Sequence, residues 1–233
     1  MGQSTIYHDG TYQQNNPGWH EEDSPWKARQ IAEILKKNHI VPFTVGEIGC
    51  GAGGILKFLA EQYGQAVTLC GYEISPQAFE LCREKEAPNL HFFLKDLLAE
   101  AQPTFDVSLA IDVLEHVEDY CGFLRKFART GVYKIFHIPL DLSVQTVLRA
   151  TPIIQQRITV GHLHYFTKET ALATLKDAGY EVVDWRYTSG SSELPNRSWK
   201  AKLLKLPRRF LLRFHPDMAA RLLGGCSLLV LAK

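Results

Sequence analysis

Four glycines fall within six residues of the segment VGEIGCGAGG, residues 45–54, and this cluster strongly constrains the fold. The apolar run FTVGEIG around its start predicts a buried strand, and the run ILKFLAEQYG after it has helical spacing. Gly49, Gly51 and Gly54 match the spacing G-x-G-x-x-G between a strand and a helix. Such glycines permit a tight turn and let a ligand approach the backbone and the free N–H groups of the helix start. The segment therefore predicts a ligand-binding loop in an α/β fold.

Strands and helices alternate along the rest of the chain. This alternation predicts an α/β, Rossmann-like, doubly wound and mostly parallel seven-stranded sheet. The last strand breaks the rhythm, and we expect it to be antiparallel. The expected strands are 43–49, 66–73, 90–94, 105–114, 131–139, 181–188 and 226–233. The expected helices, three of them with a Ser or Thr cap, are 24–38, 55–64, 75–86, 115–128 and 167–180.

The domain organisation follows from where this pattern is interrupted. With 233 residues, the chain is long enough for one α/β domain, 1–233. The polar and aromatic segment 1–23 reads as an N-terminal arm or lid, and 189–225 as an insertion or lid before the last strand. Within the insertion, residues 196–215 combine seven Lys or Arg with apolar residues and no acid. A basic helix packed on the sheet is our preferred interpretation, with a substrate lid or membrane-surface contact as alternatives.

Charge and cysteine usage limit the partners. The net charge is +1, so no electrostatic argument favours nucleic acid as the main partner. The five cysteines are scattered without a CxxC pair, which predicts reduced thiols and a cytoplasmic location rather than a disulfide framework or a thiolate metal site. The first residues lack the pattern of a secretory signal. The oligomeric state is not predicted.

Acidic residues after successive strands narrow the ligand class. Glu73 ends the second strand, where an acid accepts hydrogen bonds from ribose hydroxyls. Glu47 directly before the glycines would repel a pyrophosphate, yet it suits an ammonium group. Asp96 follows the third strand and could accept from an exocyclic amine. The segment DVLEHVED, residues 112–119, follows the fourth. An adenosine-containing ligand is therefore expected, and a nicotinamide dinucleotide is disfavoured.

Together these features resemble the class I S-adenosylmethionine-dependent methyltransferases. The resemblance covers residues 45–139, and the last two strands resemble that family's final hairpin. It implies S-adenosylmethionine as cofactor, with the glycine loop along its methionine part, Glu73 on the ribose and Asp96 on the adenine. Asp96 and Asp112 could instead be helix caps. The resemblance assigns to the cofactor Glu47, Gly49, Cys50, Gly51, Gly53, Glu73, Ile74, Asp96, Leu97, Asp112 and Val113.

The first helix and the arm before it supply further candidates. Lys27 could meet the cofactor's carboxylate, although solvated surface charge is the commoner role of such a residue. Four residues read as a lid over cofactor or substrate, with packing against the first helix as the alternative reading. These lid residues, with the more distant His162, make up the predicted substrate-binding set: Tyr12, Trp19, His20, Trp26 and His162.

Histidines are the candidate general bases. Methyl transfer needs a base only if the nucleophile arrives protonated, and the predicted catalytic residues are His116, His137 and His164. Each could instead be a hydrogen-bonded structural histidine. In some quinone-precursor O-methyltransferases of this family, the segment that corresponds to Glu115 and His116 is linked to a divalent metal. Asp112 could join them here, but we prefer a helix-capping network and predict no metal site.

The expected function is methyl transfer from S-adenosylmethionine to oxygen or nitrogen of a small-molecule acceptor. The alternatives are a non-catalytic S-adenosylmethionine-binding module and a methyltransferase acting on a lipid-like or macromolecular acceptor. Methyltransferases of nucleic-acid base amines in this family carry an Asn/Asp-Pro-Pro-aromatic motif after the fourth strand. Here that place reads DVLE, residues 112–115, so no nucleic-acid acceptor is expected.

Overall fold

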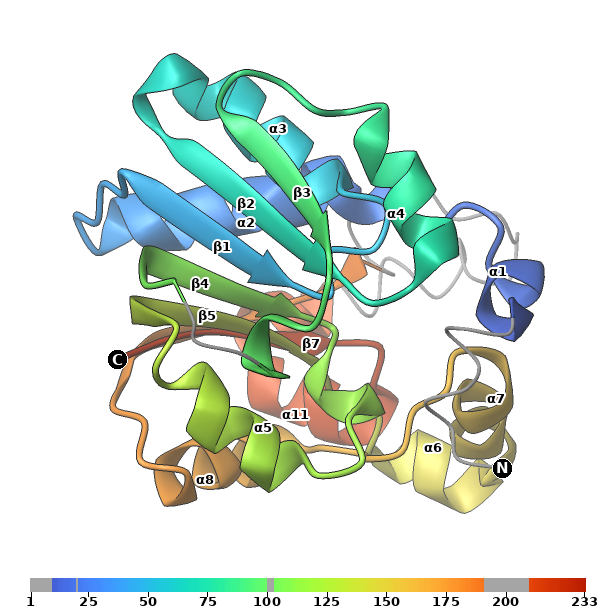
Figure 1. Ribbon diagram of the computed structural model, residues 1–233. Coiled ribbons are helices and arrows are strands. Elements are labelled where there is room, and N and C mark those ends of the chain that lie inside the picture. The colour runs from blue at the N-terminus through green and yellow to red at the C-terminus, as the bar shows by residue number, and fades with distance from the viewer. Residues whose placement is uncertain (1–9, 20, 100–102, 191–209) are drawn as a thin grey trace.

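The chain folds around one seven-stranded mixed sheet. The computed structural model describes residues 10–19, 21–99, 103–190 and 210–233. The strand order is β3-β2-β1-β4-β5-β7-β6, and β7 is antiparallel to both of its neighbours. The predicted Rossmann-like fold with an antiparallel last strand is thereby confirmed (Figure 1). The strands are β1 (Thr44–Ile48), β2 (Thr68–Glu73), β3 (Leu90–Leu94), β4 (Phe105–Ile111), β5 (Gly131–Pro139), β6 (Val182–Thr188) and β7 (Ser227–Ala232).

Helices cover both faces of this sheet. The α-helices are α1 (Thr11–Asn15), α2 (Ser24–Lys37), α3 (Gly54–Tyr63), α4 (Pro76–Arg83), α5 (Tyr120–Phe127), α6 (Val144–Arg149), α7 (Thr151–Thr159), α8 (Lys168–Asp177) and α11 (Pro216–Leu223). Short 3-10 turns are η2 (Glu21–Asp23), η3 (Gly64–Ala66), η4 (Leu97–Ala99) and η5 (Leu114–His116). Buried side chains of α2, α3 and α4 pack on one face of the sheet, and those of α5 and α8 pack on the other.

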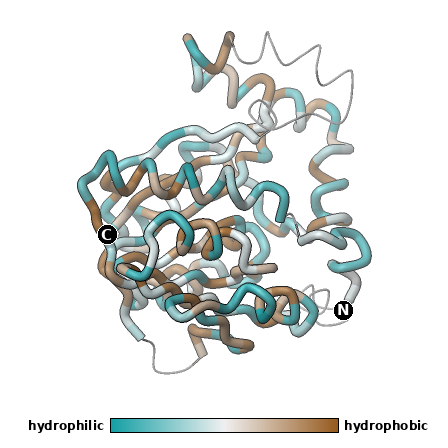
Figure 2. The backbone as a smooth tube through the Cα atoms, turned by 90° about the horizontal axis from the view of Figure 1, so that it is seen from above, coloured by the Kyte–Doolittle hydropathy of each residue, from teal (hydrophilic) through white to brown (hydrophobic). Residues whose placement is uncertain are grey.

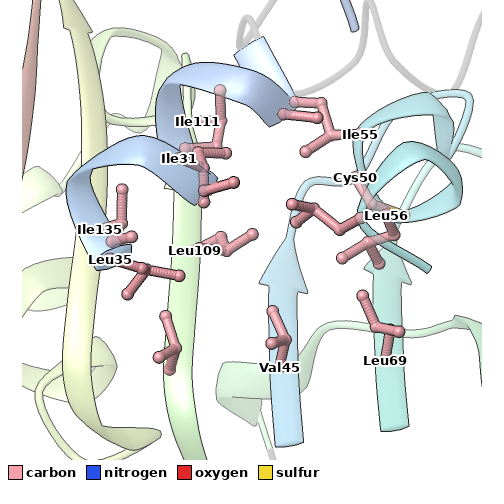
Figure 3. Close-up of a cluster of buried hydrophobic side chains, with 14 of the residues drawn as sticks. Ile31, Leu35, Val45, Cys50, Ile55, Leu56, Leu69, Leu109, Ile111 and Ile135 are labelled. Atoms are coloured by element: carbon pink, nitrogen blue, oxygen red, sulfur yellow. The ribbon is translucent and has the colours of Figure 1, made fainter. Parts of the chain in front are cut away.

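The two cores arise from the periodicity of the sequence. Ile31 and Leu35 lie one helical turn apart on α2 and pack over Leu109 and Ile135 of the central strands (Figure 3). All four side chains are at most 1% exposed. Figure 2 shows hydrophilic and hydrophobic residues alternating along the outer helices, as expected where one side of a helix faces the sheet. This packing holds the ends of the central strands in fixed positions.

Helix boundaries agree with the sequence where a side-chain cap forms. Ser75 accepts a hydrogen bond from the Ala78 amide, and Thr167 forms a capping box with Thr170. The N-cap of α2 is Asp23 without a side-chain bond, so the prediction of Ser24 as cap was wrong. The expected helix 115–128 is divided into η5 and α5, because Asp119 caps α5 through the Gly122 amide.

Three short helices lie beyond the carboxyl ends of the parallel strands. Figure 1 shows α1, α6 and α7 on the side to which the arrowheads of β1, β2 and β4 point. Helices α6 and α7 were not predicted from the sequence. Asn16 at the end of α1 donates through Nδ2 to the Thr159 carbonyl of α7 at 3.1 Å, which ties the arm to this region.

Parts of the two predicted lids lie outside the described residues. The arm is described from residue 10, apart from residue 20, and most of the basic segment 196–215 is not described. The described part of the insertion contains α11, whose Ala219 and Ala220 are buried. None of the described helices is long and apolar enough to cross a membrane.

Candidate functional site

A pocket of about 750 Å³ lies at the carboxyl ends of the parallel strands. This edge is where α/β sheets of this kind bind ligands, because the loops after successive strands meet there. All but three of the predicted site residues line it. Gly53 and His164 do not, and His20 lies outside the described residues. The lining residues among the predicted set are Tyr12, Trp19, Trp26, Lys27, Glu47, Gly49, Cys50, Gly51, Glu73, Ile74, Asp96, Leu97, Asp112, Val113, His116, His137 and His162.

The glycines of the loop have two different roles. Gly51 and Gly53 have φ angles of 54° and 76°, in the left-handed region that favours glycine. A Cβ atom on Gly51 would meet nothing within 4 Å, so there is open space beside its Cα. A Cβ atom on Gly53 would lie 2.7 Å from the ring of Phe92. Gly53 therefore permits packing on β3, and Gly54 lines the pocket in its place.

Glu73 is fixed at the end of β2 by backbone donors. Its Oε2 accepts from the Gly51 amide at 2.9 Å, and its Oε1 accepts from the Ile74 and Ser75 amides at 2.8 Å. These bonds link the glycine loop to the loop after the second strand. The carboxylate is thus held in one orientation at the pocket wall.

Asp96 acts as a cap for the turn after β3 and also lies in the pocket wall. Its Oδ1 accepts from the Leu98 amide at 2.8 Å, as in a helix cap, and the residue also lines the pocket. A carboxylate has several acceptor sites, so this hydrogen bond does not prevent a second one to a ligand.

Glu47 is a buried carboxyl group in the pocket wall. It is 1% exposed, and its Oε2 has no hydrogen-bond partner within the described part of the chain. Burial raises the pKa of this carboxyl well above its usual range, although Lys27 opposes the shift. An acceptor left in this state costs free energy unless a donor arrives, and a ligand with N–H groups would provide one.

A continuous polar chain joins Lys27, Asp112 and His137 of the pocket wall to Thr188. Lys27 Nζ lies 2.7 Å from Asp112 Oδ2, and His137 Nδ1 lies 2.5 Å from Asp112 Oδ1. His137 Nε2 lies 2.8 Å from Thr188 Oγ1. Burial alone would raise the pKa of the Asp112 carboxyl, but His137 and Lys27 together hold it well below its usual range. Asp112 therefore pairs with these two side chains and does not cap α5.

His164 lies away from the pocket lining. Its Nε2 lies 2.9 Å from the Val117 carbonyl oxygen, and its ring packs at 4.6 Å from that of Tyr120. This placement gives no geometric support to its predicted role as a base.

Glu115, His116 and His162 converge at another part of the pocket wall. Glu115 is fully buried, and burial raises the pKa of its carboxyl well above the usual range. Burial also lowers the pKa of His116 to about 4, with His162 acting in the same direction. The pKa shifts thus favour uncharged groups at this position.

Aromatic residues of the arm and of α2 form another wall. Tyr12 is 8% exposed, and its ring lies 4.7 Å from that of Trp19. The Trp26 ring meets that of His137 edge-on at 6.2 Å. Tyr12, Trp19 and Trp26 thus reach the pocket, and their action as a lid remains a prediction.

Comparison with known proteins identifies the family. A family model described as a methyltransferase domain matches residues 19–184, most of the chain. The chain belongs to the S-adenosylmethionine-dependent methyltransferase family. Magnesium protoporphyrin IX methyltransferase from Synechocystis, solved with S-adenosylhomocysteine, superposes with a TM-score of 0.60 and 16% identity, over 94% of this chain and 85% of that one. The N-methyltransferase NodS from Bradyrhizobium japonicum superposes with a TM-score of 0.58 and 17% identity, over 95% of this chain and 97% of that one.

Curated relatives of this methyltransferase match over shorter stretches. The 2-methyl-6-phytyl-1,4-hydroquinone methyltransferase of Synechocystis sp. is 34% identical over 90 residues, which are 37% of this chain and 28% of that relative. Norajmaline N-methyltransferase of Rauvolfia serpentina is 29% identical over 138 residues, 53% of this chain and 46% of the relative. The chain thus aligns with less than half the length of these two proteins.

One residue of the methyltransferase pocket and two residues that contact its lining were not among the predicted site residues. Asp141 binds His162, Thr188 binds His137, and Gly54 lines the wall where Gly53 was expected. Asp141 comes two residues after β5 ends, so the rule that found Asp96 could have found it too. Nothing in the sequence around Thr188 indicates that it meets His137, because β6 is brought near β5 only through β7.

Proposed function

We propose that this chain transfers a methyl group from S-adenosylmethionine to oxygen or nitrogen of a small-molecule acceptor. The observation that carries the proposal is the pocket, where the glycine loop, Glu47 and Glu73 meet in a chain of this family. Relatives named for a hydroquinone and for an alkaloid amine support an acceptor of metabolite size.

The residues present fit the cofactor. Glu47 has a buried oxygen without a partner in the described residues, which suits the amino group of the methionine part. Gly51 leaves open space for a close approach, and Glu73 offers a fixed carboxylate to the ribose hydroxyls. Asp96 would accept from the adenine amine. The cofactor, when bound, supplies an electrophilic methyl group.

The chain's own contribution is to align and desolvate the nucleophile. His137 is our preferred base if the acceptor arrives protonated, because Asp112 orients its ring from the Nδ1 side, as carboxylates do in acid–base pairs. Its Nε2 must then exchange Thr188 Oγ1 for the acceptor. Tyr12 and Trp19 of the arm would cover the bound molecules. A cytoplasmic location remains a prediction.

Calorimetric titration of S-adenosylhomocysteine tests the proposal directly. Wild type should bind, and Glu73→Gln should weaken binding by about 1–2 kcal/mol, roughly a 5- to 30-fold rise in Kd, because a charged acceptor is lost. Glu61→Gln on the exposed side of α3 is the matched control and should bind as wild type does.

Circular dichroism must first show that each protein is folded, so that a loss of binding is distinguished from a loss of structure. A folded wild type that binds neither S-adenosylmethionine nor S-adenosylhomocysteine would overturn the proposal. Binding without turnover on a broad panel of hydroxyl and amine acceptors would favour a non-catalytic binding module.

A further inference from the structure

Three side chains from two segments converge in the pocket wall. Glu115 and His116 lie in η5, shortly after β4, and His162 lies in the extended segment before α8. Their ligating atoms all lie within 4.8 Å of one another. The rings of His116 and His162 pack edge to face, with centroids 4.9 Å apart. We propose that Glu115, His116 and His162 bind a divalent metal ion.

Glu115 is the first reason. It is fully buried, and neither carboxylate oxygen has a hydrogen-bond partner among the described residues. Its Oε1 lies 3.8 Å from His116 Nε2 and 3.9 Å from His162 Nε2, too far for hydrogen bonds. A carboxyl group isolated from donors in this way is costly to bury. A cation between the three groups removes that cost.

The tautomers of the two histidines are the second reason. His162 Nδ1 lies 2.6 Å from Asp141 Oδ2, and His116 Nδ1 lies 3.2 Å from the Gly161 carbonyl oxygen. Both oxygens are acceptors, so each Nδ1 carries the hydrogen and each neutral ring has its lone pair on Nε2. Both Nε2 atoms lie near the Glu115 carboxylate. A histidine whose other nitrogen donates to a carboxylate or carbonyl is the usual form of a metal ligand.

The third reason is that the backbone holds the two segments together. The amides of Leu163 and His164 both donate to the Glu115 carbonyl, at 2.7 and 3.2 Å. Tyr165 adds a hydrogen bond from its hydroxyl to the His162 carbonyl at 3.1 Å. The positions of the ligands are therefore largely set before an ion binds, which reduces the entropy lost on binding.

Asp112 does not belong to this set. Its two oxygens pair with Lys27 and His137, and it is not part of the group whose ligating atoms converge. The cluster thus differs from the alternative considered from the sequence, since His162 from a distant segment takes the third position.

The donor types indicate the kind of ion. Two imidazoles and one carboxylate favour a borderline divalent cation such as Zn²⁺ over Mg²⁺ or Ca²⁺. Ligand atoms around tetrahedral Zn²⁺ are about 3.4 Å apart, so separations of up to 4.8 Å in the cluster would shorten by at most about 1.4 Å. All three residues line the pocket, and the remaining coordination position would take an oxygen of the acceptor. That last role rests on the proposed function, whereas binding of the ion does not.

Titration of chelator-treated protein with Co²⁺ tests the site without cofactor or acceptor. Wild type should develop the visible absorption of Co²⁺ bound by nitrogen ligands, with one ion per chain, and Zn²⁺ should displace it and raise the melting temperature. Glu115→Gln and His162→Asn should each bind at least about tenfold more weakly, and Asp141→Asn about 10- to 100-fold more weakly. His91→Gln on β3 is the control and should bind as wild type does.

Two results would overturn the inference. One is a wild type that shows neither the absorption nor a Zn²⁺-dependent rise in melting temperature. The Glu115 carboxyl group would then be stabilised by protonation and not by a metal ion. The other is wild-type affinity in Glu115→Gln and His162→Asn, which would place the ion elsewhere. If one variant does not fold, the other decides. S-adenosylhomocysteine titrated into the same metal-free protein shows separately whether the proposed function fails.

Discussion

Alanine at Gly53 or Gly51 should separate the packing role of the loop from its binding role. Both residues have left-handed φ angles, so each alanine carries a backbone cost of roughly 1–2 kcal/mol. At Gly53 the new Cβ would also lie 2.7 Å from two atoms of the buried Phe92 ring and 3.3 Å from Cys82 Sγ. Overpacking of this kind costs a further 1–3 kcal/mol or so. We therefore expect G53A to lose about 2–5 kcal/mol of stability and G51A about 1–2.

Binding should follow the opposite order. The Gly51 Cβ meets no protein atom within 4 Å and would project into the space proposed for the cofactor. G51A should therefore raise the Kd for S-adenosylhomocysteine more than G53A does, under conditions where both variants are folded. Urea unfolding followed by circular dichroism gives the stabilities, and calorimetry gives the affinities.

Each variant serves as the control for the other. The two substitutions add the same methyl group to the same loop, and the gain from a stiffer unfolded chain cancels in their difference. If G53A proved as stable as G51A, the contact with Phe92 would not be a constraint. If G53A bound more weakly than G51A, Gly53 would have the cofactor role that the sequence analysis assigned to it.

Three further substitutions probe charges. E47Q should raise the melting temperature of the ligand-free protein, because it removes a buried carboxyl group, and it should weaken the binding of S-adenosylhomocysteine. Thermal melts measure the first effect and calorimetry measures the second. Unchanged affinity would count against a contact between Glu47 and the amino group of the cofactor. Breaking a fully buried ion pair costs roughly 3–5 kcal/mol. K27M should lower the free energy of unfolding by less than this, because the Asp112 side chain is 28% exposed, and urea unfolding measures the change. The pKa of Asp106 is lowered, chiefly by the Phe43 amide, so its stabilising effect is present above about pH 4 and disappears on acidification. The stability gap between wild type and D106N should narrow from about pH 6 to about pH 3, and a constant gap would exclude this origin.

Much of the fold could be predicted because its signals are local. Ser75 and Thr167 cap their helices as expected, since a cap bonds to an amide only three residues away. The helices α6 and α7 were missed, because residues such as Leu148 and Ile158 are apolar and exposed and give no clear buried face. A helix is predicted from apolar residues that recur at helical spacing along one buried face, and α6 and α7 lack such a face.

The acidic residues of the pocket wall could also be predicted from the sequence. Glu47, Glu73, Asp96 and Asp112 each follow or end a strand, and parallel strands bring such positions to one edge whatever the details of packing. Gly53 differs from these residues, because it does not line the pocket. Spacing cannot show whether a glycine faces a ligand or the ring of Phe92.

The sequence by itself determined the fold class, the glycine loop and the acidic residues beside it. These features depend on neighbouring residues in the chain and on the rule that the carboxyl ends of parallel strands meet at one edge of the sheet. Only the tertiary structure decided which polar side chains lie next to one another in the pocket. Lys27 meets Asp112, His137 meets Thr188, and Glu115 meets His162 across long sequence separations. Such contacts form within a few ångströms, and their geometry depends on strand register and helix placement that no local pattern encodes.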